Sequence, residues 1–260
     1  MISFEAIKIA SRDWLHAKPF PHFVVDNFFT SDIAKALESE IPHYDSRLWH
    51  EYSNAIEEKK TCNNWNVYPP LTYQVFQYLN SGEFVSTLSQ TLFGDEILTS
   101  DNGLNGGGWH IHSNGGKLNP HLDYSIHPKL AKQRKVNIII YLNSSWDFSW
   151  GGGLGLWEGD EKQPHKLSKV IEPKFNRAAI FDTTCNSWHG LSGRLVCPED
   201  QYRKSIAVYY LTTPHENADP RGKALFAPSE EQKDNKKVLD LIKKRASVDT
   251  ATEVWKELDE

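Results

Sequence analysis

This sequence of 260 residues has few cysteines, no long apolar run and no excess of basic residues. Cys62, Cys185 and Cys197 are widely spaced and form no C-x-x-C pair, which disfavours a disulfide framework and a structural zinc site. The longest apolar run, near residues 138–142, is far shorter than the ~20 residues that span a bilayer. Residues 1–14 lack the apolar segment of a signal peptide. We therefore expect a cytoplasmic protein without a membrane partner.

The charge balance is slightly acidic, with 29 Lys and Arg against 34 Asp and Glu and a formal net charge of -5. Such a chain lacks the excess of positive charge that binds a polyanion, so we expect no nucleic-acid partner. The hydrophobic share of 39% is ordinary for a globular protein, and 260 residues can bury an ample core. Size and composition are therefore compatible with an enzyme built on one large β-rich domain with added helices.

Helical patterns precede a central region of short strands. Before residue 100 the sequence predicts an entry strand at 22–26 and three helices, which begin near Thr30, at Pro69 and at Ser81, with a polar loop between the first two helices. Between about 104 and 212, short β-type segments alternate with Gly, Pro, Asn and Asp, as expected of an all-β sandwich or barrel. The expected strands are 108–112, 118–124, 135–142, 154–158, 167–171, 178–182, 187–191 and 204–211.

The C-terminal part is charged and helical in pattern. Residues 229–232 form a capping-box sequence that should open a helix, with the basic residues 243–245 in its last turn. A final helix is expected to place Val248, Thr252, Trp255 and Leu258 on one face and to bury Trp255 against the body or another subunit. A homodimer contact through these helices therefore stays open.

The simplest organisation is one catalytic domain in three parts. Residues 1–100 supply a strand and helices that pack on the core, 101–215 form the β-core, and 216–260 form a helical extension. No internal repeat and no low-complexity linker interrupts this order.

His121-Leu-Asp123 places an imidazole and a carboxylate two residues apart, so a strand aims both at the same face. Non-haem Fe(II) oxygenases bind iron with two histidines and one carboxylate and leave the opposite face open. A His and an Asp on a strand also form ordinary surface pairs, so this interpretation needs a distant histidine. His189, which follows the apolar segment 178–182, is the candidate for the third ligand.

Arg203 begins an apolar strand and shares its face with Ser205 and Tyr209. A buried guanidinium needs an anion, and a guest carboxylate bound in two places, with help from the Ser205 hydroxyl, is one solution. An arginine at the rim that pairs with a protein acid is the other. Tyr141, with Asn137 on the same face of the apolar strand 135–142, needs a partner for its hydroxyl and could also be a core residue bonded to backbone.

In this order, these residues resemble the 2-oxoglutarate oxygenases. Several blocks look like the prolyl 4-hydroxylase-like branch of that superfamily, from an entry strand near Pro19 to Leu211. The blocks are Pro19-Phe-Pro-His-Phe-Val-Val-Asp-Asn27, Asn119-Pro-His-Leu-Asp123, Asn137-Ile-Ile-Ile-Tyr-Leu-Asn143, Trp150-Gly-Gly-Gly-Leu154, Ile171-Glu-Pro-Lys-Phe-Asn-Arg177 and Arg203-Lys-Ser-Ile-Ala-Val-Tyr-Tyr210. The resemblance implies a mainly β fold, a double-stranded β-helix or jelly roll that resembles the cupins, with iron at its mouth.

The same resemblance implies roles for individual residues. His121, Asp123 and His189 match the Fe(II) ligands, Arg203 the anchor of the distal carboxylate of 2-oxoglutarate, and Tyr141 a hydroxyl that bonds the same carboxylate. Ser205 is assigned to that site by strand face alone. The implied reaction uses O2, with ascorbate as reductant, releases succinate and CO2, and hydroxylates an unactivated C–H bond. The carboxylate of Asp123 points to hydroxylation, because halogenating members of the superfamily lack it.

Two alternatives stay open from the sequence. A non-enzymatic, cupin-like metal-binding protein could use His110 and His112, two apart on a strand, together with His121. The substrate could be a proline in a peptide or protein, or a small metabolite such as a free amino acid or a sugar derivative.

Other residues receive weaker expectations. Trp188 and Tyr209 are candidates for the substrate pocket. The basic run 127–135 could receive an acidic substrate but is expected to be mostly a solvated loop. The remaining histidines, including His127, His165 and His215, are expected at the surface.

Overall fold

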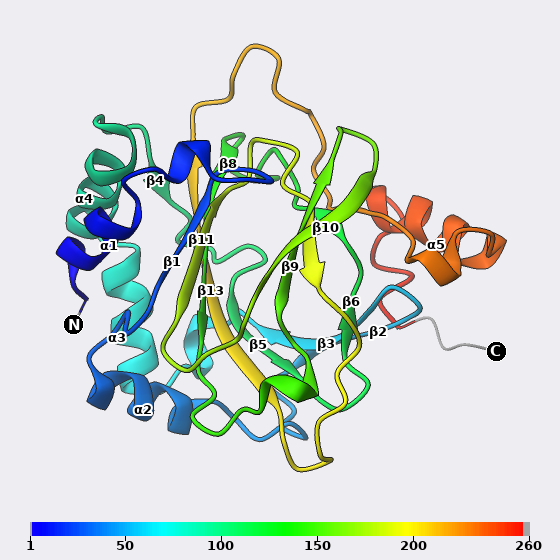
Figure 1. Cartoon of the computed structure of the whole chain (residues 1–260), viewed down its shortest axis with the longest axis horizontal. Helices are drawn as coiled ribbons and strands as arrows, with labels where there is room; N and C mark the ends of the chain where they lie inside the picture. Colours follow the sequence, from blue (N-terminus) through cyan, green and yellow to red (C-terminus); the bar gives the residue numbers. More distant parts are fainter. Residues whose placement is uncertain (1, 257–260) are drawn as a thin grey trace.

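Two antiparallel sheets face each other in the computed structural model, which describes residues 2–256 (Figure 1). Helices α1–α4 lie on one side of the pair and α5 on the other. The helices are α1 (Phe4–Ala10), α2 (Ser31–Glu40), α3 (Pro70–Leu79), α4 (Gly82–Phe93) and α5 (Lys236–Ala246). None of the helices in this part of the chain is long and apolar enough to cross a membrane.

The larger sheet has the strand order β1-β11-β8-β13-β5-β3-β2, with β4 paired to β13 and β6 to β3. Its strands are β1 (His22–Val25), β2 (His50–Ser53), β3 (Glu57–Cys62), β4 (Thr99–Ser100), β5 (Gly108–His112), β6 (Lys117–Leu118), β8 (Gln133–Tyr141), β11 (Ala178–Asp182) and β13 (Arg203–Thr212). The smaller sheet has the order β10-β9-β12-β7-β14. Its strands are β7 (His121–Leu122), β9 (Leu154–Gly159), β10 (Pro164–Ile171), β12 (His189–Leu191) and β14 (Leu225–Phe226). The mainly β jelly roll with helices before and after it is therefore confirmed.

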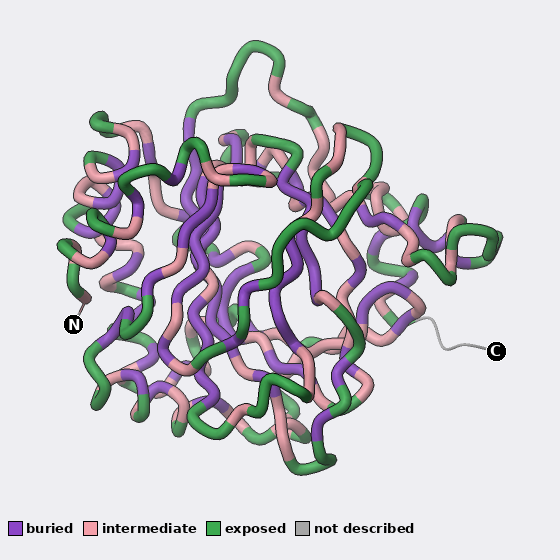
Figure 2. The backbone as a smooth tube through the Cα atoms, viewed as in Figure 1, coloured by how far each residue is buried: buried purple, intermediate pink, exposed green. Residues whose placement is uncertain are grey.

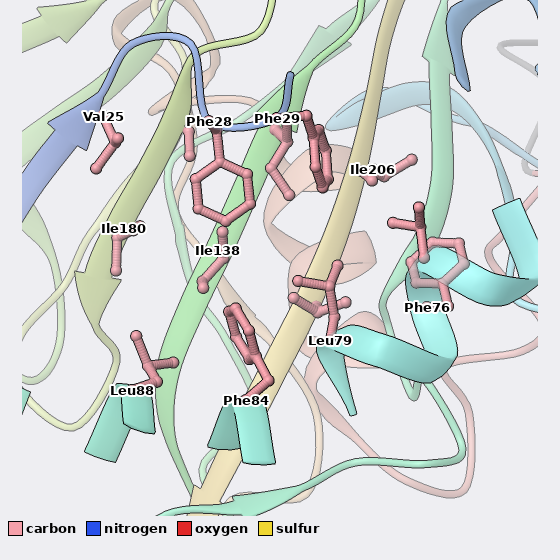
Figure 3. Packing of buried hydrophobic residues seen from close by; sticks show 14 of the residues in the cluster. Val25, Phe28, Phe29, Phe76, Leu79, Phe84, Leu88, Ile138, Ile180 and Ile206 are labelled. Atoms are coloured by element: carbon pink, nitrogen blue, oxygen red, sulfur yellow. The ribbon is translucent and has the colours of Figure 1, made fainter. Parts of the chain in front are cut away.

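The outer face of the larger sheet is covered by the N-terminal helices. Ile138, Ile180 and Ile206, from β8, β11 and β13, pack in one cluster with Phe84 and Leu88 of α4, and all five are fully buried (Figure 3). Burying a side chain of this size contributes about 1.5–3 kcal/mol. Packing on this face stabilises the sheet, so the opposite face can carry polar groups.

Strand β8 shows how one strand serves both faces. Ile138 and Ile140 belong to the cluster under the helices, whereas Ile139 and Tyr141 face the smaller sheet with Leu156. The continuous apolar sequence of this strand follows from burial on both sides. The buried stretches of the backbone accordingly coincide with the central strands, while the loop 213–219 is largely exposed (Figure 2).

Several elements differ from the prediction. The polar segment after α2 contains the β2–β3 hairpin rather than a loop, and α1 was not predicted. The strand expected at 118–124 is split into β6 and β7. Pro120 lies between them and has no N–H for a ladder bond, and the Asn119 N–H instead donates to the Ile56 carbonyl.

The C-terminal extension also differs. The capping box at Ser229 is present but opens only a 3-10 turn, Glu230–Gln232, and α5 begins later with Asn235 as its N-cap. The final helix expected over 248–258 is absent from its described part, where residues 248–256 form turns, and Leu258 lies outside the described residues. The Trp255 carbonyl accepts a bond from the Ser53 N–H of the hairpin, so Trp255 packs against the body of the protein as expected.

Candidate active site

A cavity of about 450 Å³ lies on the inner face of the larger sheet. Strand register builds its floor, because four lining residues follow one another as paired residues across β2, β3, β5 and β13, namely His50, Thr61, His110 and Ser205. Ser205 pairs in turn with Tyr141 of β8. In the same strand pairs, Tyr52 pairs with Lys59 and His112 pairs with Arg203. Antiparallel pairing thus gathers polar side chains from distant parts of the sequence onto one surface.

Three side chains meet at the opposite wall. His189 pairs with His121 across β12 and β7, and Asp123 follows β7 directly. His121 Nε2 lies 3.7 Å from Asp123 Oδ1, and His189 Nε2 lies 3.8 Å from Asp123 Oδ2. The ligand atoms of all three residues lie within 4.8 Å of one another. This is the spacing of donors that a single metal ion can bridge.

Each of the two histidines is oriented by a local hydrogen bond of the same type. The His121 Nδ1–H donates to the Asn119 carbonyl at 3.0 Å, and the His189 Nδ1–H donates to the Ser187 carbonyl at 2.8 Å. A carbonyl can only accept, so Nδ1 carries the proton and Nε2 keeps its lone pair. Metal-binding histidines are commonly held by such a bond.

The protonation states also suit a metal. Burial, reinforced by His189, lowers the pKa of His121 to about 3, and burial lowers the pKa of His189 as well. Burial acts in the opposite direction on Asp123, but Arg134 and the two histidines outweigh it and lower the pKa of that carboxyl to about 2. At neutral pH the site therefore offers two neutral imidazoles and a carboxylate, which are the forms that bind metal.

Arg134 holds the carboxylate of Asp123 from behind. Its Nη1 lies 3.2 Å from Asp123 Oδ2, and its Nη2 donates to the Asn105 carbonyl at 2.6 Å. The guanidinium lies between the rings of Tyr124 and Tyr209, with Cζ 3.6 Å and 3.4 Å from their centroids. The expectation that the basic run 127–135 is mostly a solvated loop is therefore wrong at Arg134, which is buried in the cavity wall.

Arg203 enters the cavity without a protein anion. It is 4% exposed, and no carboxylate of residues 2–256 lies within ion-pair distance of it. Its Nε donates to the Gly152 carbonyl at 2.7 Å. Gly152 has φ +79°, and a Cβ there would come within 2.9 Å of Arg203 Cδ, so glycine is required for this approach. Burial lowers the pKa of the guanidinium, as expected for a charge removed from water without a counterion.

Unpaired polar atoms surround Arg203. The Tyr141 ring centroid lies 5.0 Å from its Cζ, and the Tyr141 hydroxyl interacts with the guanidinium but makes no hydrogen bond of good geometry among the described residues. Both ring nitrogens of His112, which pairs with Arg203 across β5 and β13, likewise make no such hydrogen bond. Buried polar groups are nearly always bonded, so this end of the cavity is built for a polar guest.

The other residues predicted for the substrate pocket or for metal binding differ in where they lie. Ser205 and Tyr209 line the cavity, whereas Trp188 is fully buried beside Leu122 and donates to the Asp160 carbonyl, so the pocket role predicted for Trp188 is wrong. His110 and His112 line the cavity but do not join the three-residue group.

One histidine predicted at the surface is buried. His127 is 3% exposed, and its Nε2 lies 3.4 Å from Asp101 Oδ1. Its Nδ1 accepts bonds from the Lys129 and Leu130 N–H groups, so it holds the turn that precedes β8.

Sequence patterns did not indicate two elements that complete the cavity. The β2–β3 hairpin contributes Lys59 and Thr61, and β14 contributes Phe226, whose ring stacks on that of His121 at 4.9 Å and 21°. The register of β14 against β7 sets Phe226 opposite His121. A two-residue strand leaves no periodic signal, so only the His121 contact reveals this role.

The buried histidines predict an acid-sensitive fold for the metal-free protein. Burial lowers the pKa of His112 well below its usual range and that of His110 to about 3. The unfolded chain takes up protons on these side chains below about pH 6.5 and the folded protein does not, so stability falls as the pH falls from there toward 3. Urea titrations measure the free energy of unfolding. Between pH 6 and pH 5 this free energy should fall by about 1 kcal/mol less in His112→Gln than in the parent.

Ile111→Val on the same strand is the matched control. It should cost about 0.5–1.5 kcal/mol at both pH values and leave the pH dependence unchanged. An equal loss of stability on acidification in the parent and in His112→Gln would show that His112 is protonated in the folded state.

The comparisons with known proteins agree with this geometry. Residues 107–211, which run from β5 to β13, match the model of the 2OG-Fe(II) oxygenase superfamily. The prolyl 3-hydroxylase OGFOD1 of Mus musculus is 26% identical over 210 residues, or 75% of this chain and 33% of the relative. The chain thus spans about a third of the length of that relative.

Solved structures share the fold. A Pseudomonas putida prolyl-4-hydroxylase aligns with a TM-score of 0.56 and 17% identity, over 80% of this chain and 99% of the other. A Trichoplax adhaerens prolyl hydroxylase in complex with a hypoxia-inducible-factor peptide fragment aligns with a TM-score of 0.54 and 18% identity, over 80% and 90%. Residues 107–211 of the chain are therefore similar to the 2OG-Fe(II) oxygenase superfamily, and the fold is shared with solved prolyl hydroxylases.

Proposed function

We propose that this protein is an Fe(II)- and 2-oxoglutarate-dependent dioxygenase that hydroxylates a proline residue in a peptide or protein. The observation that carries the proposal is the convergence of His121, Asp123 and His189 in the cavity that also holds Arg203, a buried cation without a protein anion. Metal ligands alone would fit many metalloproteins. The combination with an unpaired guanidinium is what a metal and a dicarboxylic acid require together.

In this proposal each side chain has a defined task. His121, Asp123 and His189 hold the iron through two Nε2 atoms and a carboxylate oxygen. Arg203 binds the distal carboxylate of 2-oxoglutarate, and the hydroxyls of Tyr141 and Ser205 donate to it. When bound, the iron would support the oxidation by O2 of 2-oxoglutarate to succinate and CO2 and of a substrate C–H bond to an alcohol. Ascorbate is not consumed in that reaction and would serve to reduce iron that has become oxidised.

Neighbouring residues prepare this site. Arg134 neutralises one oxygen of Asp123 and fixes its direction, since its own guanidinium is clamped between two tyrosines. Phe226 limits rotation of the His121 ring by stacking on it. Apolar side chains on the cavity wall, Ile139, Leu154 and Leu191, keep water away from the reacting groups.

Substrate, location and domain organisation belong to the same proposal. A proline substrate is supported by the similarity to a prolyl 3-hydroxylase and by the shared fold with prolyl hydroxylases, one of them in complex with a peptide. We place the activity in the cytoplasm, because Cys62, Cys185 and Cys197 are free thiols and a reducing compartment keeps iron ferrous. Residues 101–215 would carry the chemistry, with 1–100 and 216–260 packed on them as parts of one catalytic domain.

The metal ligands are tested by removing them singly. The protein supplied with Fe(II), ascorbate, O2 and 2-oxoglutarate should form succinate slowly even without a prime substrate. His121→Ala and Asp123→Ala should each lose this turnover together with iron binding, because three protein ligands leave no spare donor. Succinate release and metal content after gel filtration are the measurements.

His165→Ala is the control, since His165 is exposed and lies outside the cavity. It should keep both iron and turnover. Succinate formation that persists in both ligand variants would remove the three residues from the iron site.

Arg203→Ala separates the co-substrate from the metal. It should leave iron binding nearly intact and weaken 2-oxoglutarate binding by about 2–4 kcal/mol, the cost of one charged bidentate contact. The concentration of 2-oxoglutarate at half-maximal succinate formation measures this effect.

Arg177→Ala serves as the control, because that arginine pairs with Asp26 outside the cavity. An Arg203→Ala variant with the parent's requirement for 2-oxoglutarate would assign Arg203 to structure alone.

A further inference from the structure

Positive charge dominates the wall of the cavity. Among residues 2–256, the charged side chains that line it are one carboxylate, Asp123, and five cations, Lys59, Arg134, Arg203, Lys223 and Arg245. The proposed function uses two of these cations, since Arg134 contacts Asp123 and Arg203 faces the co-substrate. Lys59, Lys223 and Arg245 have no task in it.

A single buried acid compensates two of the remaining cations. Glu57 is fully buried, with Arg245 Nε 2.7 Å from its Oε1 and Lys59 Nζ 3.2 Å from its Oε2. Lys223 has no ion-pair or hydrogen-bond partner within residues 2–256, and burial together with the nearby Arg245 lowers its pKa. Three cations are therefore balanced by a single carboxylate, and an added anion would reduce the repulsion between them.

The inner end of the cavity does not supply that anion. The two charges of Fe(II) cancel those of 2-oxoglutarate, and the carboxylate of Asp123 is outweighed by Arg134 and Arg203. The metal and its co-substrate thus leave no negative charge for the other three cations to balance. The remaining guest of the cavity is the prime substrate, and an acidic group on it would supply the missing anion.

Aromatic rings lie beside these cations in the cavity wall. Lys59 lies on β3, and Lys223 and Arg245 lie in the segment that follows β13. The rings of His50, Tyr52 and Trp255 meet beside them, with centroids 4.5–5.6 Å apart, and all three line the cavity. Flat rings next to cations that share a single acid offer contact both to a peptide chain and to a carboxylate on it.

We propose that the substrate is a proline-containing peptide with an acidic side chain next to the reacting proline, and that Lys59, Lys223 and Arg245 bind its carboxylate. This inference rests on the proposed function and names the substrate class of the same site. Lys223 is the decisive residue, because it has no protein partner and its replacement leaves no buried acid unpaired.

The test uses three capped pentapeptides, Ala-Glu-Pro-Glu-Ala, Ala-Gln-Pro-Gln-Ala and Ala-Lys-Pro-Lys-Ala. Their binding to the full chain loaded with Mn(II) and 2-oxoglutarate is measured by calorimetry without O2, so that no turnover is needed. The glutamate peptide should bind at least about tenfold more tightly than the glutamine peptide, the lysine peptide should bind most weakly, and added salt should weaken the first alone.

Charge reversal at Lys223 sharpens the test. Lys223→Glu should weaken the glutamate peptide by about tenfold or more and make the lysine peptide the better ligand. Lys237→Glu makes the same charge change at an exposed position on α5, outside the cavity, and should keep the parent's preference. N-acetylglutamate α-amide, which offers one side-chain carboxylate without the peptide, should bind more weakly than the glutamate peptide.

Equal binding of the three peptides, binding of none of them, or an unchanged preference in Lys223→Glu would overturn the inference. N-acetylglutamate α-amide that binds as tightly as the peptide would assign the site to a small acid and overturn the inference as well. Succinate formation by the same preparation, measured without peptide, reports on the oxygenase proposal separately. A preparation that turns over 2-oxoglutarate but shows no acidic preference keeps the proposed function and loses this inference.

Discussion

The register of the smaller sheet is the constraint on which the site depends. It sets His189 of β12 and Phe226 of β14 on either side of His121 of β7. Each histidine then donates Nδ1–H to the carbonyl two residues before it, and the two Nε2 atoms converge on Asp123. A slip of one residue in either pairing would turn a ligand to the opposite face of the sheet. The metal geometry is thus specified by backbone hydrogen bonds before any metal binds.

The larger sheet divides its two faces between stability and chemistry. Its outer face buries aliphatic and aromatic side chains under α1–α4, whereas its inner face carries His110, His112, Arg203 and Ser205. Several buried polar atoms on the inner face lack partners, and each such atom costs about 1–3 kcal/mol. The apolar outer face offsets this cost, and the unpaired groups stay available for a ligand. The acid sensitivity expected of the metal-free fold has the same origin.

The sequence was informative wherever burial leaves a period in it. Strands β5 and β11 were predicted with their observed bounds, and β8 was recognised because burial on both faces gives a nearly continuous apolar run. The H-x-D spacing and the two-residue period of β13 likewise named the residues that the structure gathers around one cavity. These patterns depend only on local geometry, so no tertiary information was needed to read them.

The remainder of the site depends on tertiary contacts. The β2–β3 hairpin was missed because Lys59 and Thr61 face a polar cavity and the buried Glu57 is charged, which removes the apolar alternation that marks a strand. Arg134 belongs to a basic run, and only the rings of Tyr124 and Tyr209 reveal that it is buried. The capping box at Ser229 formed as predicted, but the chain after it turns before α5 begins. Capping chemistry fixes a local bond and leaves the length of the following helix to packing.

An anaerobic crystal structure with Mn(II) and 2-oxoglutarate tests the central claim most directly. The anomalous signal should place the metal against His121 Nε2, His189 Nε2 and the carboxylate of Asp123, with the distal carboxylate of 2-oxoglutarate on Arg203. A metal bound instead at His110 and His112, or a co-substrate that avoids Arg203, would contradict the account.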